Sequence, residues 1–252
     1  MFMVTEASLA GQKILITRPR QQSDQLAELI EQAGGKPILF PVIAINPLLP
    51  SDWQQPAFKL DHANWLIFVS RNAVLSFMSG WQTELPKHLK FAAVGGGTAQ
   101  AMRESGLKVD CQPEISSGSE GLLMMPEMQD VAGCKIIIIR GVGGREHLAD
   151  TLASRGASIS YMEVYRRDVA VQDKVSIERA MAADKLICTS VAGIDNVCQI
   201  LSDGMTNLLN KPLVVVSNRI KAHAESKGFS CVLVSTDASD VAMLQTLIRM
   251  DE

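Results

Sequence analysis

Residues 11–18 read Gly-Gln-Lys-Ile-Leu-Ile-Thr-Arg, and residues 133–140 read Gly-Cys-Lys-Ile-Ile-Ile-Ile-Arg. The second stretch begins 122 positions after the first, and two further pairs of segments match at the same spacing. They are residues 26–34 with 148–156, and residues 91–106 with 213–228. This period is far longer than the repeat of a solenoid or a propeller, so it indicates two copies of one domain-sized unit.

Short apolar stretches alternate with helical patterns along the chain. Six stretches are predicted to be strands: Lys13–Thr17, Trp65–Ser70, Lys90–Val94, Lys135–Arg140, Lys185–Ser190 and Leu213–Ser217. Most are apolar throughout, as expected for strands that are buried on both faces of a parallel sheet. Between them, Leu26, Leu29 and Ile30 share one face of a predicted helix. This alternation predicts an α/β protein with two similar doubly wound domains, each built on a parallel sheet.

Two segments do not fit the alternation of strand and helix. Residues 36–47 and 158–171 are extended, and they are longer than the usual connection between a helix and a strand. If both segments cross from one domain to the other, each domain combines parts of both copies, with a cleft between the domains. The first domain is then residues 1–42 with 168–252, and the second is residues 46–164. On pattern alone, two consecutive domains divided near residue 130 fit equally well.

The composition is that of an ordinary soluble protein, with 47% hydrophobic residues among 252 and a formal net charge of −3. A mildly acidic chain is not expected to have nucleic acid or a membrane surface as its main partner, because both demand a basic face. We find no apolar core of signal-peptide length and no run that could span a bilayer, and the 5 cysteines form no Cys-x-x-Cys pair. We therefore expect a cytoplasmic protein and, without a long apolar stripe, a monomer.

Familiar catalytic signatures are missing from the chain. The glycine pairs Gly141-x-Gly143 and Gly95-x-Gly97 lack the third glycine of a dinucleotide-binding loop. The chain has no phosphate-binding Gly-Lys-Ser/Thr loop and no Gly-x-Ser-x-Gly elbow, and its 4 histidines are scattered. We expect chemistry that uses no metal, no cofactor and no covalent nucleophile.

Hydroxyls, glycines and arginines gather where the predicted strands end. In doubly wound sheets the ligand crevice lies beyond these ends, where helix N-termini offer free N–H groups and a partial positive charge. The candidate residues for binding an anion are Arg18, Ser70, Gly96, Gly97, Thr98, Arg140, Gly143, Gly144, Arg145, Ser190, Asn218 and Arg219. The alternative is that Ser70, Thr98 and Ser190 only cap helices and that the arginines only solubilise the surface.

Nearly the whole chain resembles the uroporphyrinogen-III synthase family. The resemblance rests on residues 14–19, 65–74, 93–99, 119–123 and 139–145 and on the pair Val164-Tyr165. It implies two α/β domains joined by a two-segment β-ladder, which favours the crossed arrangement over a division near residue 130. It also implies a reaction of tetrapyrrole (haem) biosynthesis. Hydroxymethylbilane, which carries eight carboxylates, loses water and closes into uroporphyrinogen III with its ring D inverted, without a cofactor.

The resemblance implies that Tyr165 is the catalytic residue, because the family's Val-Tyr motif places it on a linker facing the cleft. A phenol is protonated at neutral pH and can donate a hydrogen bond to the departing hydroxyl. The alternative is that Tyr165 only anchors the β-ladder, and Tyr161 is expected to pack on the same face of the segment. The resemblance also implies that the candidate residues at the strand ends hold the substrate's carboxylates.

One departure from the family is visible after the penultimate predicted strand. Many relatives have a Pro-x-Thr turn there, whereas this chain reads Ser217-Asn218-Arg219, so the threonine contact is not carried over. Asn218 is the candidate for a replacement hydrogen bond.

Other classes of protein also fit the pattern. A cytoplasmic two-lobed binding or sensor module uses paired α/β units to capture an anionic small molecule. A nucleotide-dependent enzyme is disfavoured by the incomplete glycine loops. Formation of the type III isomer from hydroxymethylbilane distinguishes the synthase from both.

Overall fold

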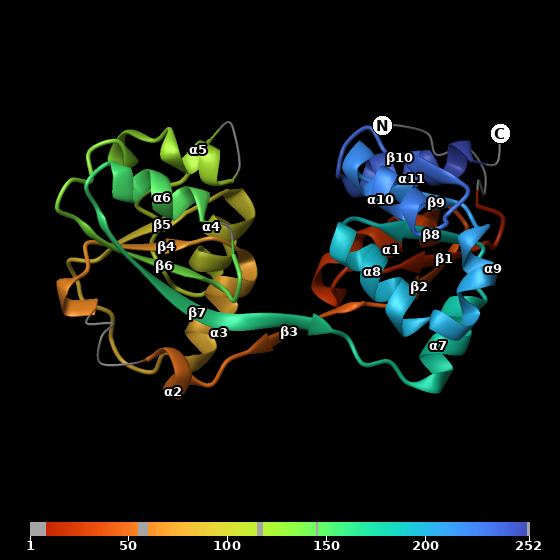
Figure 1. Ribbon diagram of the computed structural model, residues 1–252, viewed down its shortest axis with the longest axis horizontal. Helices are drawn as coiled ribbons and strands as arrows, with labels where there is room; N and C mark the ends of the chain where they lie inside the picture. The colour runs from red at the N-terminus through yellow and green to blue at the C-terminus, as the bar shows by residue number, and fades with distance from the viewer. Residues whose placement is uncertain (1–8, 55–59, 115–117, 145, 251–252) are drawn as a thin grey trace. The chain divides into compact units, whose positions relative to one another are not determined.

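The computed structural model describes residues 9–54, 60–114, 118–144 and 146–250 (Figure 1). It divides into two compact units. Unit 1 comprises Met1–Ala44 and Asp168–Glu252, and unit 2 comprises Ile45–Arg167. The chain therefore passes from one unit to the other twice.

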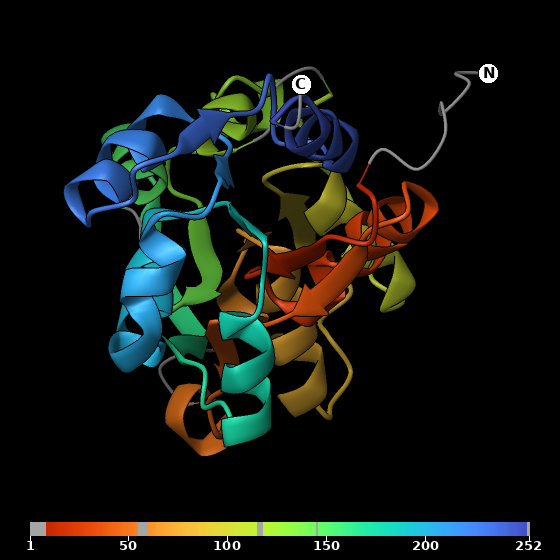
Figure 2. The ribbon, with the colours of Figure 1, turned by 90° about the vertical axis from the view of Figure 1, so that its right-hand side faces the viewer.

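Unit 1 is built on a parallel sheet of five strands in the order β10-β9-β8-β1-β2. The strands are β1 (Lys13–Ile16), β2 (Lys36–Leu39), β8 (Lys185–Cys188), β9 (Leu213–Val215) and β10 (Val232–Val234). In Figure 2 this sheet runs from the blue strands of the C-terminal part to the red and orange strands of the N-terminal part. Two separate apolar clusters cover the two faces of the sheet. Unit 1 is therefore doubly wound.

Helices α1 (Asp24–Gln32) and α11 (Asp240–Arg249) pack on one face of this sheet. Helices α8 (Val191–Ile200) and α10 (Asn218–Ser226) pack on the other. The remaining helices of unit 1 are η1 (Arg20–Gln22), α7 (Lys174–Met181), η4 (Ser202–Gly204) and α9 (Met205–Leu209).

Unit 2 is built on a second five-stranded sheet in the order β3-β7-β6-β4-β5. The strands are β3 (Ile43–Pro47), β4 (Trp65–Phe68), β5 (Lys90–Ala93), β6 (Lys135–Gly141) and β7 (Ser158–Val169). The last four are paired in parallel. Beside β7, the amide of Leu48 donates to the Val164 carbonyl and the amide of Ala170 donates to the Val42 carbonyl. The residue numbers of these partners run in opposite directions, so β3 lies antiparallel to β7.

Helices cover both faces of the second sheet as well. Side chains of α3 (Arg71–Gly80) and α4 (Gly96–Glu104) join the apolar cluster on one face, and those of α5 (Ser119–Leu123) and α6 (His147–Ser154) join the cluster on the other. The remaining helices of unit 2 are α2 (Pro50–Trp53), η2 (Leu60–His62) and η3 (Pro126–Met128).

The internal repeat is visible in the register of the strands. Lys13 lies opposite Lys36 in the β1–β2 pair, and Lys135 lies opposite Ser158 in the β6–β7 pair, so both partners are displaced by the same 122 positions. Strand β1 then pairs with β8, and β6 pairs with β4. Each sheet therefore contains strands from both copies.

The predicted α/β class with two mainly parallel sheets is confirmed, with β3 as an antiparallel edge strand of the second sheet. All six predicted strands are present as β1, β4, β5, β6, β8 and β9. Strand β10 was not predicted from the sequence. Within the described residues, no helix has both the length and the apolar character needed to cross a lipid bilayer.

Candidate functional site

A pocket of about 310 Å³ opens in unit 2 beside the carboxyl ends of β4 and β6. Strands β7, β6 and β4 are neighbours in the sheet, so residues at or after their ends converge on one place. The lining residues are Val69, Ser70, Ser119, Ile138, Arg140, Gly141, Val142, Gly144, Leu148, Tyr165 and Arg167. The pocket combines one phenol, two guanidinium groups and two hydroxyls with an apolar wall.

Tyr165 has a buried ring, and its phenol oxygen has two polar neighbours. The side chain is 1% exposed, and its oxygen lies 3.2 Å from Ser70 Oγ and 3.2 Å from Arg167 Nη2. The ring rests against the backbone of Gly141, where a Cβ would lie 2.6 Å from two ring carbons. The close approach of strand β6 therefore fixes the position of the phenol.

A β-bulge in β7 decides which way Tyr165 faces. The register passes from Arg140 opposite Glu163 to Gly141 opposite Tyr165, which leaves Val164 as the extra residue. Tyr165 consequently joins the apolar cluster that contains Val164, whereas Tyr161 packs against the cluster on the other face. The prediction that the two tyrosines share a face is wrong, because the bulge interrupts the alternation of side chains along the strand.

The three hydroxyl residues predicted at strand ends have different roles. Ser70 and Ser190 do cap helices, since their Oγ atoms accept hydrogen bonds from the amides of Ala73 and Gly193 at 3.1 and 2.9 Å. The Ser70 cap leaves that hydroxyl within reach of Tyr165. Thr98 is not a cap: α4 begins at Gly96 with Gly95 as its N-cap, and Thr98 is buried in the first turn.

Arg140 forms a network with two carboxylates at the rim of the pocket. Its side chain is 9% exposed and donates to Glu146 Oε1 at 2.9 Å, to Glu163 Oε1 at 3.0 Å and to the Gly144 carbonyl at 3.2 Å. The guanidinium also lies 3.6 Å from the centroid of the Tyr161 ring, and the Tyr161 hydroxyl bonds to Glu146. The charge of Arg140 is therefore matched within the protein, and the contacts hold the loop after β6 against β7.

The same network shifts three pKa values. Burial alone lowers the pKa of Arg140, but the hydrogen bonds to Glu146 and Glu163 raise it above its ordinary value. The hydrogen bond from Tyr161, and next the one from Arg140, lower the pKa of Glu146. Burial, reinforced by Glu146, raises the pKa of Tyr161 to about 12. The network is therefore most stable with Glu146 ionised and Tyr161 neutral.

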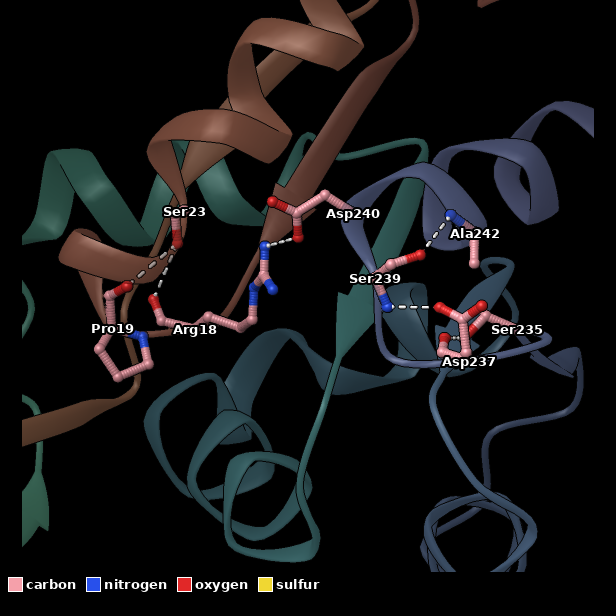
Figure 3. Close-up of polar contacts among 8 residues, drawn as sticks. All are labelled: Arg18, Pro19, Ser23, Ser235, Asp237, Ser239, Asp240 and Ala242. Carbon is pink, nitrogen blue, oxygen red and sulfur yellow. Dashed lines mark hydrogen bonds and ion pairs between the residues drawn. The ribbon is translucent and has the colours of Figure 1, made fainter. Parts of the chain in front are cut away.

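Arg18 is held in a second ion pair, in unit 1 (Figure 3). Its Nη2 lies 2.7 Å from Asp240 Oδ1, and the two side chains are 10% and 15% exposed. Ser239 caps the helix that Asp240 begins, and the Ser23 hydroxyl donates to the carbonyl of Arg18. Within the described residues the buried Nε of Arg18 has no hydrogen-bond partner.

The predicted site residues lie in both units. Unit 2 contains Ser70, Gly96, Gly97, Thr98, Arg140, Gly143, Gly144 and Tyr165, and unit 1 contains Arg18, Ser190, Asn218 and Arg219. Arg145 is outside the described residues. Of the predicted set, Ser70, Arg140, Gly144 and Tyr165 meet around the pocket. Asn218 is the first residue of α10, whose cap is Ser217, and Gly96 and Gly97 are exposed at the start of α4.

Two polar lining residues were not predicted from the sequence: Ser119 and Arg167. A signal for Arg167 was available, because it follows Tyr165 by two residues in an extended segment, and such residues face the same way. No comparable signal exists for Ser119, which reaches the pocket from α5.

Known proteins resemble this chain along nearly its full length. The family model described as uroporphyrinogen-III synthase HemD matches residues 24–245. Uroporphyrinogen-III synthase of Escherichia coli K12 is 31% identical over 247 residues, which covers 93% of this chain and 99% of that protein. The enzyme of Salmonella typhimurium LT2 is 31% identical over 248 residues, with the same coverage of each chain.

Solved structures support the fold. The uroporphyrinogen-III synthetase of Helicobacter pylori 26695 superposes with a TM-score of 0.66 at 14% identity, covering 95% of this chain and 99% of that one. A mutant uroporphyrinogen III synthase of Thermus thermophilus gives a TM-score of 0.58 at 19% identity, covering 96% and 100%. The family model spans most of the chain and these relatives match it almost end to end, so this protein belongs to the uroporphyrinogen-III synthase family.

Proposed function

We propose that this enzyme converts hydroxymethylbilane into uroporphyrinogen III, as a cyclising hydro-lyase that needs no cofactor. The observation that carries the proposal is the Tyr165 phenol, fixed between Ser70 and Arg167 at a pocket of about 310 Å³, in a chain that belongs to this family. The substrate is a small molecule, and we expect the enzyme to act as a cytoplasmic monomer without a nucleic acid or membrane partner.

The reaction needs help at two points. The electron-rich pyrroles push out the terminal hydroxyl group, and a proton delivered to the departing oxygen turns it into water. We assign that proton to the Tyr165 hydroxyl. The azafulvene cation that results is attacked by the substituted carbon of ring D, and the spiro intermediate fragments and recloses with ring D inverted.

The second point is conformation. Unassisted closure gives the uninverted isomer, so the protein has to hold the chain until the substituted carbon meets the electrophile. We propose that the helix N-termini beside Ser70 and at Gly96, Gly97 and Thr98 hold carboxylates of the substrate, together with Gly143 and Gly144. In unit 1 the proposed carboxylate ligands are Ser190, Asn218 and Arg219.

Arg18 and Arg140 are also proposed to offset the negative charge of the substrate. Each is already paired with a carboxylate of the protein. We therefore expect them to contribute less binding free energy than an unpaired arginine at the same place.

Isomer analysis tests the proposal. The purified protein is incubated with hydroxymethylbilane, the products are oxidised to porphyrins, and the type I and type III isomers are separated and quantified. We expect type III to dominate with the protein and type I to dominate in buffer or with heat-denatured protein. An isomer ratio equal to that in buffer would reject the synthase, and saturable binding of the bilane without turnover would identify a binding module instead.

A further inference from the structure

Arg167 is the cation next to the phenol of Tyr165. Its Nη2 lies 3.2 Å from the Tyr165 oxygen, and its guanidinium carbon lies 5.7 Å from the centroid of the ring. A guanidinium group can only donate hydrogen bonds, so the phenol oxygen is the acceptor in this contact. The phenol hydrogen is therefore directed elsewhere, toward Ser70 Oγ or toward a group bound in the pocket.

The geometry that brings the two side chains together is set by strand β7. Tyr165 and Arg167 are two residues apart in this strand, beyond the bulge at Val164, so they project from the same side of it. Tyr165 is buried, whereas Arg167 is exposed and lines the pocket. The contact thus joins a fixed phenol to a guanidinium group at the mouth of the site.

Arg167 differs from the other lining arginine in its partners. Arg140 is bound by Glu146 and Glu163. Among the ion pairs found within residues 9–54, 60–114, 118–144 and 146–250, none joins Arg167 to a carboxylate. Among the described residues, therefore, the phenol oxygen and not a carboxylate is the partner shown for the Arg167 guanidinium group.

We infer that Arg167 is a positioning residue for Tyr165, which holds the phenol oxygen and stabilises the negative charge that forms on it when its proton is transferred. This inference rests on the proposed function. The C–O bond of the hydroxymethyl group breaks, the oxygen leaves with the electron pair and takes the Tyr165 proton, and water is formed. The phenolate remains beside Arg167 until the proton released on ring closure returns to it, so the cycle loses only water.

Two variants of Arg167 and one matched control test the inference. In Arg167→Gln we expect kcat to fall about tenfold to a hundredfold with KM nearly unchanged, because a donor to a developing oxyanion acts mainly in the transition state. Arg167→Lys keeps the positive charge and is expected to recover part of the loss. Arg166→Gln removes the same charge from the adjacent exposed position and is expected to stay close to the wild-type rate.

A double-mutant cycle separates this role from a direct contact with the substrate. In the Tyr165→Phe background, which has no phenol oxygen, Arg167→Gln is expected to cause little further loss of kcat. A wild-type rate in Arg167→Gln, an equal loss in both backgrounds, or a change in KM alone overturns the inference. Urea unfolding of each variant shows whether a loss of rate only reflects misfolding. If Arg167→Gln is misfolded and Arg167→Lys recovers none of the rate, the inference is also overturned.

The isomer ratio formed by the wild-type protein separates a failure of the proposed function from a failure of the role inferred for Arg167. If it forms no excess of type III isomer, the proposed function fails and the inference fails with it. If it forms type III and the Arg167 variants behave as the Arg166 control does, only the inference fails.

Discussion

Gly141 is the position where the pocket tolerates no side chain. A Cβ built on it would lie 2.6 Å from Tyr165 Cε2 and Cζ, closer than real side-chain contacts allow. Strand β6, which ends at Gly141, is mostly buried, and the Tyr165 ring that packs on Gly141 is buried as well. Neither the strand nor the ring can move without disturbing the core, so the absence of a side chain at Gly141 determines how closely the Tyr165 ring approaches strand β6.

Substitution of Gly141 by Ala is expected to displace Tyr165. Overpacking of this kind costs about 1–3 kcal/mol, and a shift of the phenol away from its partners should also reduce turnover. Urea unfolding and the isomer assay measure the two effects. The stability control is Gly97→Ala, where nothing lies within 4 Å of the added Cβ. A Gly141→Ala protein with wild-type stability and rate would contradict the role of this close approach.

The hydroxyl group of Tyr165 can be removed without removing its ring. Tyr165→Phe is expected to lower kcat about a hundredfold, near the lower end of general acid catalysis, and stability by about 1 kcal/mol for the lost hydrogen bonds. The matched control is Tyr161→Phe, which alters a phenol packed on the other face of the sheet. It should keep its rate. Near-normal turnover in Tyr165→Phe would leave Tyr165 only the role of an anchor.

For single residues, the sequence predicted which side chains lie at the pocket better than it predicted which side chains they bind. Tyr165, Ser70, Arg140 and Gly144 follow from strand ends and from the family resemblance, and they do meet at one pocket. The pairing of Arg140 with Glu146 and Glu163 was not foreseen, because it depends on how the loop after β6 folds back against β7. A strand-end arginine looks the same in sequence whether its charge is free or matched.

Glu146 follows strand β6 and is held by contacts with Arg140 and Tyr161. The pKa of this carboxyl group is depressed in the folded protein by Tyr161 and Arg140. A depressed pKa means that the ionised carboxylate favours the folded state. That contribution is present above the unfolded pKa of about 4.3 and is lost as the pH falls toward the folded value.

Glu146→Gln is therefore expected to lower stability at neutral pH, and the difference from the wild type should shrink as the pH falls below about 4.3. Urea unfolding midpoints of both proteins between neutral and acidic pH measure this difference. Glu178→Gln is the control, because its ion pair with Lys174 is exposed and contributes little. A difference that stays constant with pH would show that ionisation of Glu146 does not stabilise the loop.

Among the elements, long apolar strands could be predicted and local irregularities could not. The six predicted strands are buried runs that keep their pattern in any parallel sheet. The bulge at Val164 has no signature in the sequence, since it arises where β7 bends past the end of β6. The start of α4 was also not predicted: Thr98 was considered as a cap, but the helix begins two residues earlier, at Gly96.

At the scale of the molecule, the two units differ in how the chain builds them. All five strands of the second sheet lie within residues 43–169, whereas the first sheet combines β1 and β2 with three strands from beyond residue 184. The sequence repeat revealed the duplication. Because both copies have the same pattern, the repeat could not tell which copy supplies the partner of a given strand.

Fragments of the chain should therefore fold very differently. Residues 43–169 contain one complete sheet with its helices and are expected to unfold cooperatively in urea as a separate polypeptide. Residues 1–130 contain the whole first copy but lack β6, which lies between β7 and β4, and β8, which lies beside β1. We expect this fragment to give no cooperative transition by circular dichroism. Cooperative folding of residues 1–130 alone would contradict this interleaving of the copies.

The pairing of β1 with β8 has a consequence for synthesis on the ribosome. Leu15 lies opposite Leu186, so β1, which is synthesised early, can pair with β8 only after most of the chain has been synthesised. At about 5–20 residues per second this delay lasts roughly ten to thirty seconds, during which residues 45–167 can complete their own sheet. A premature stop before residue 185 would leave the earliest strand of the nascent chain with an apolar, unpaired edge.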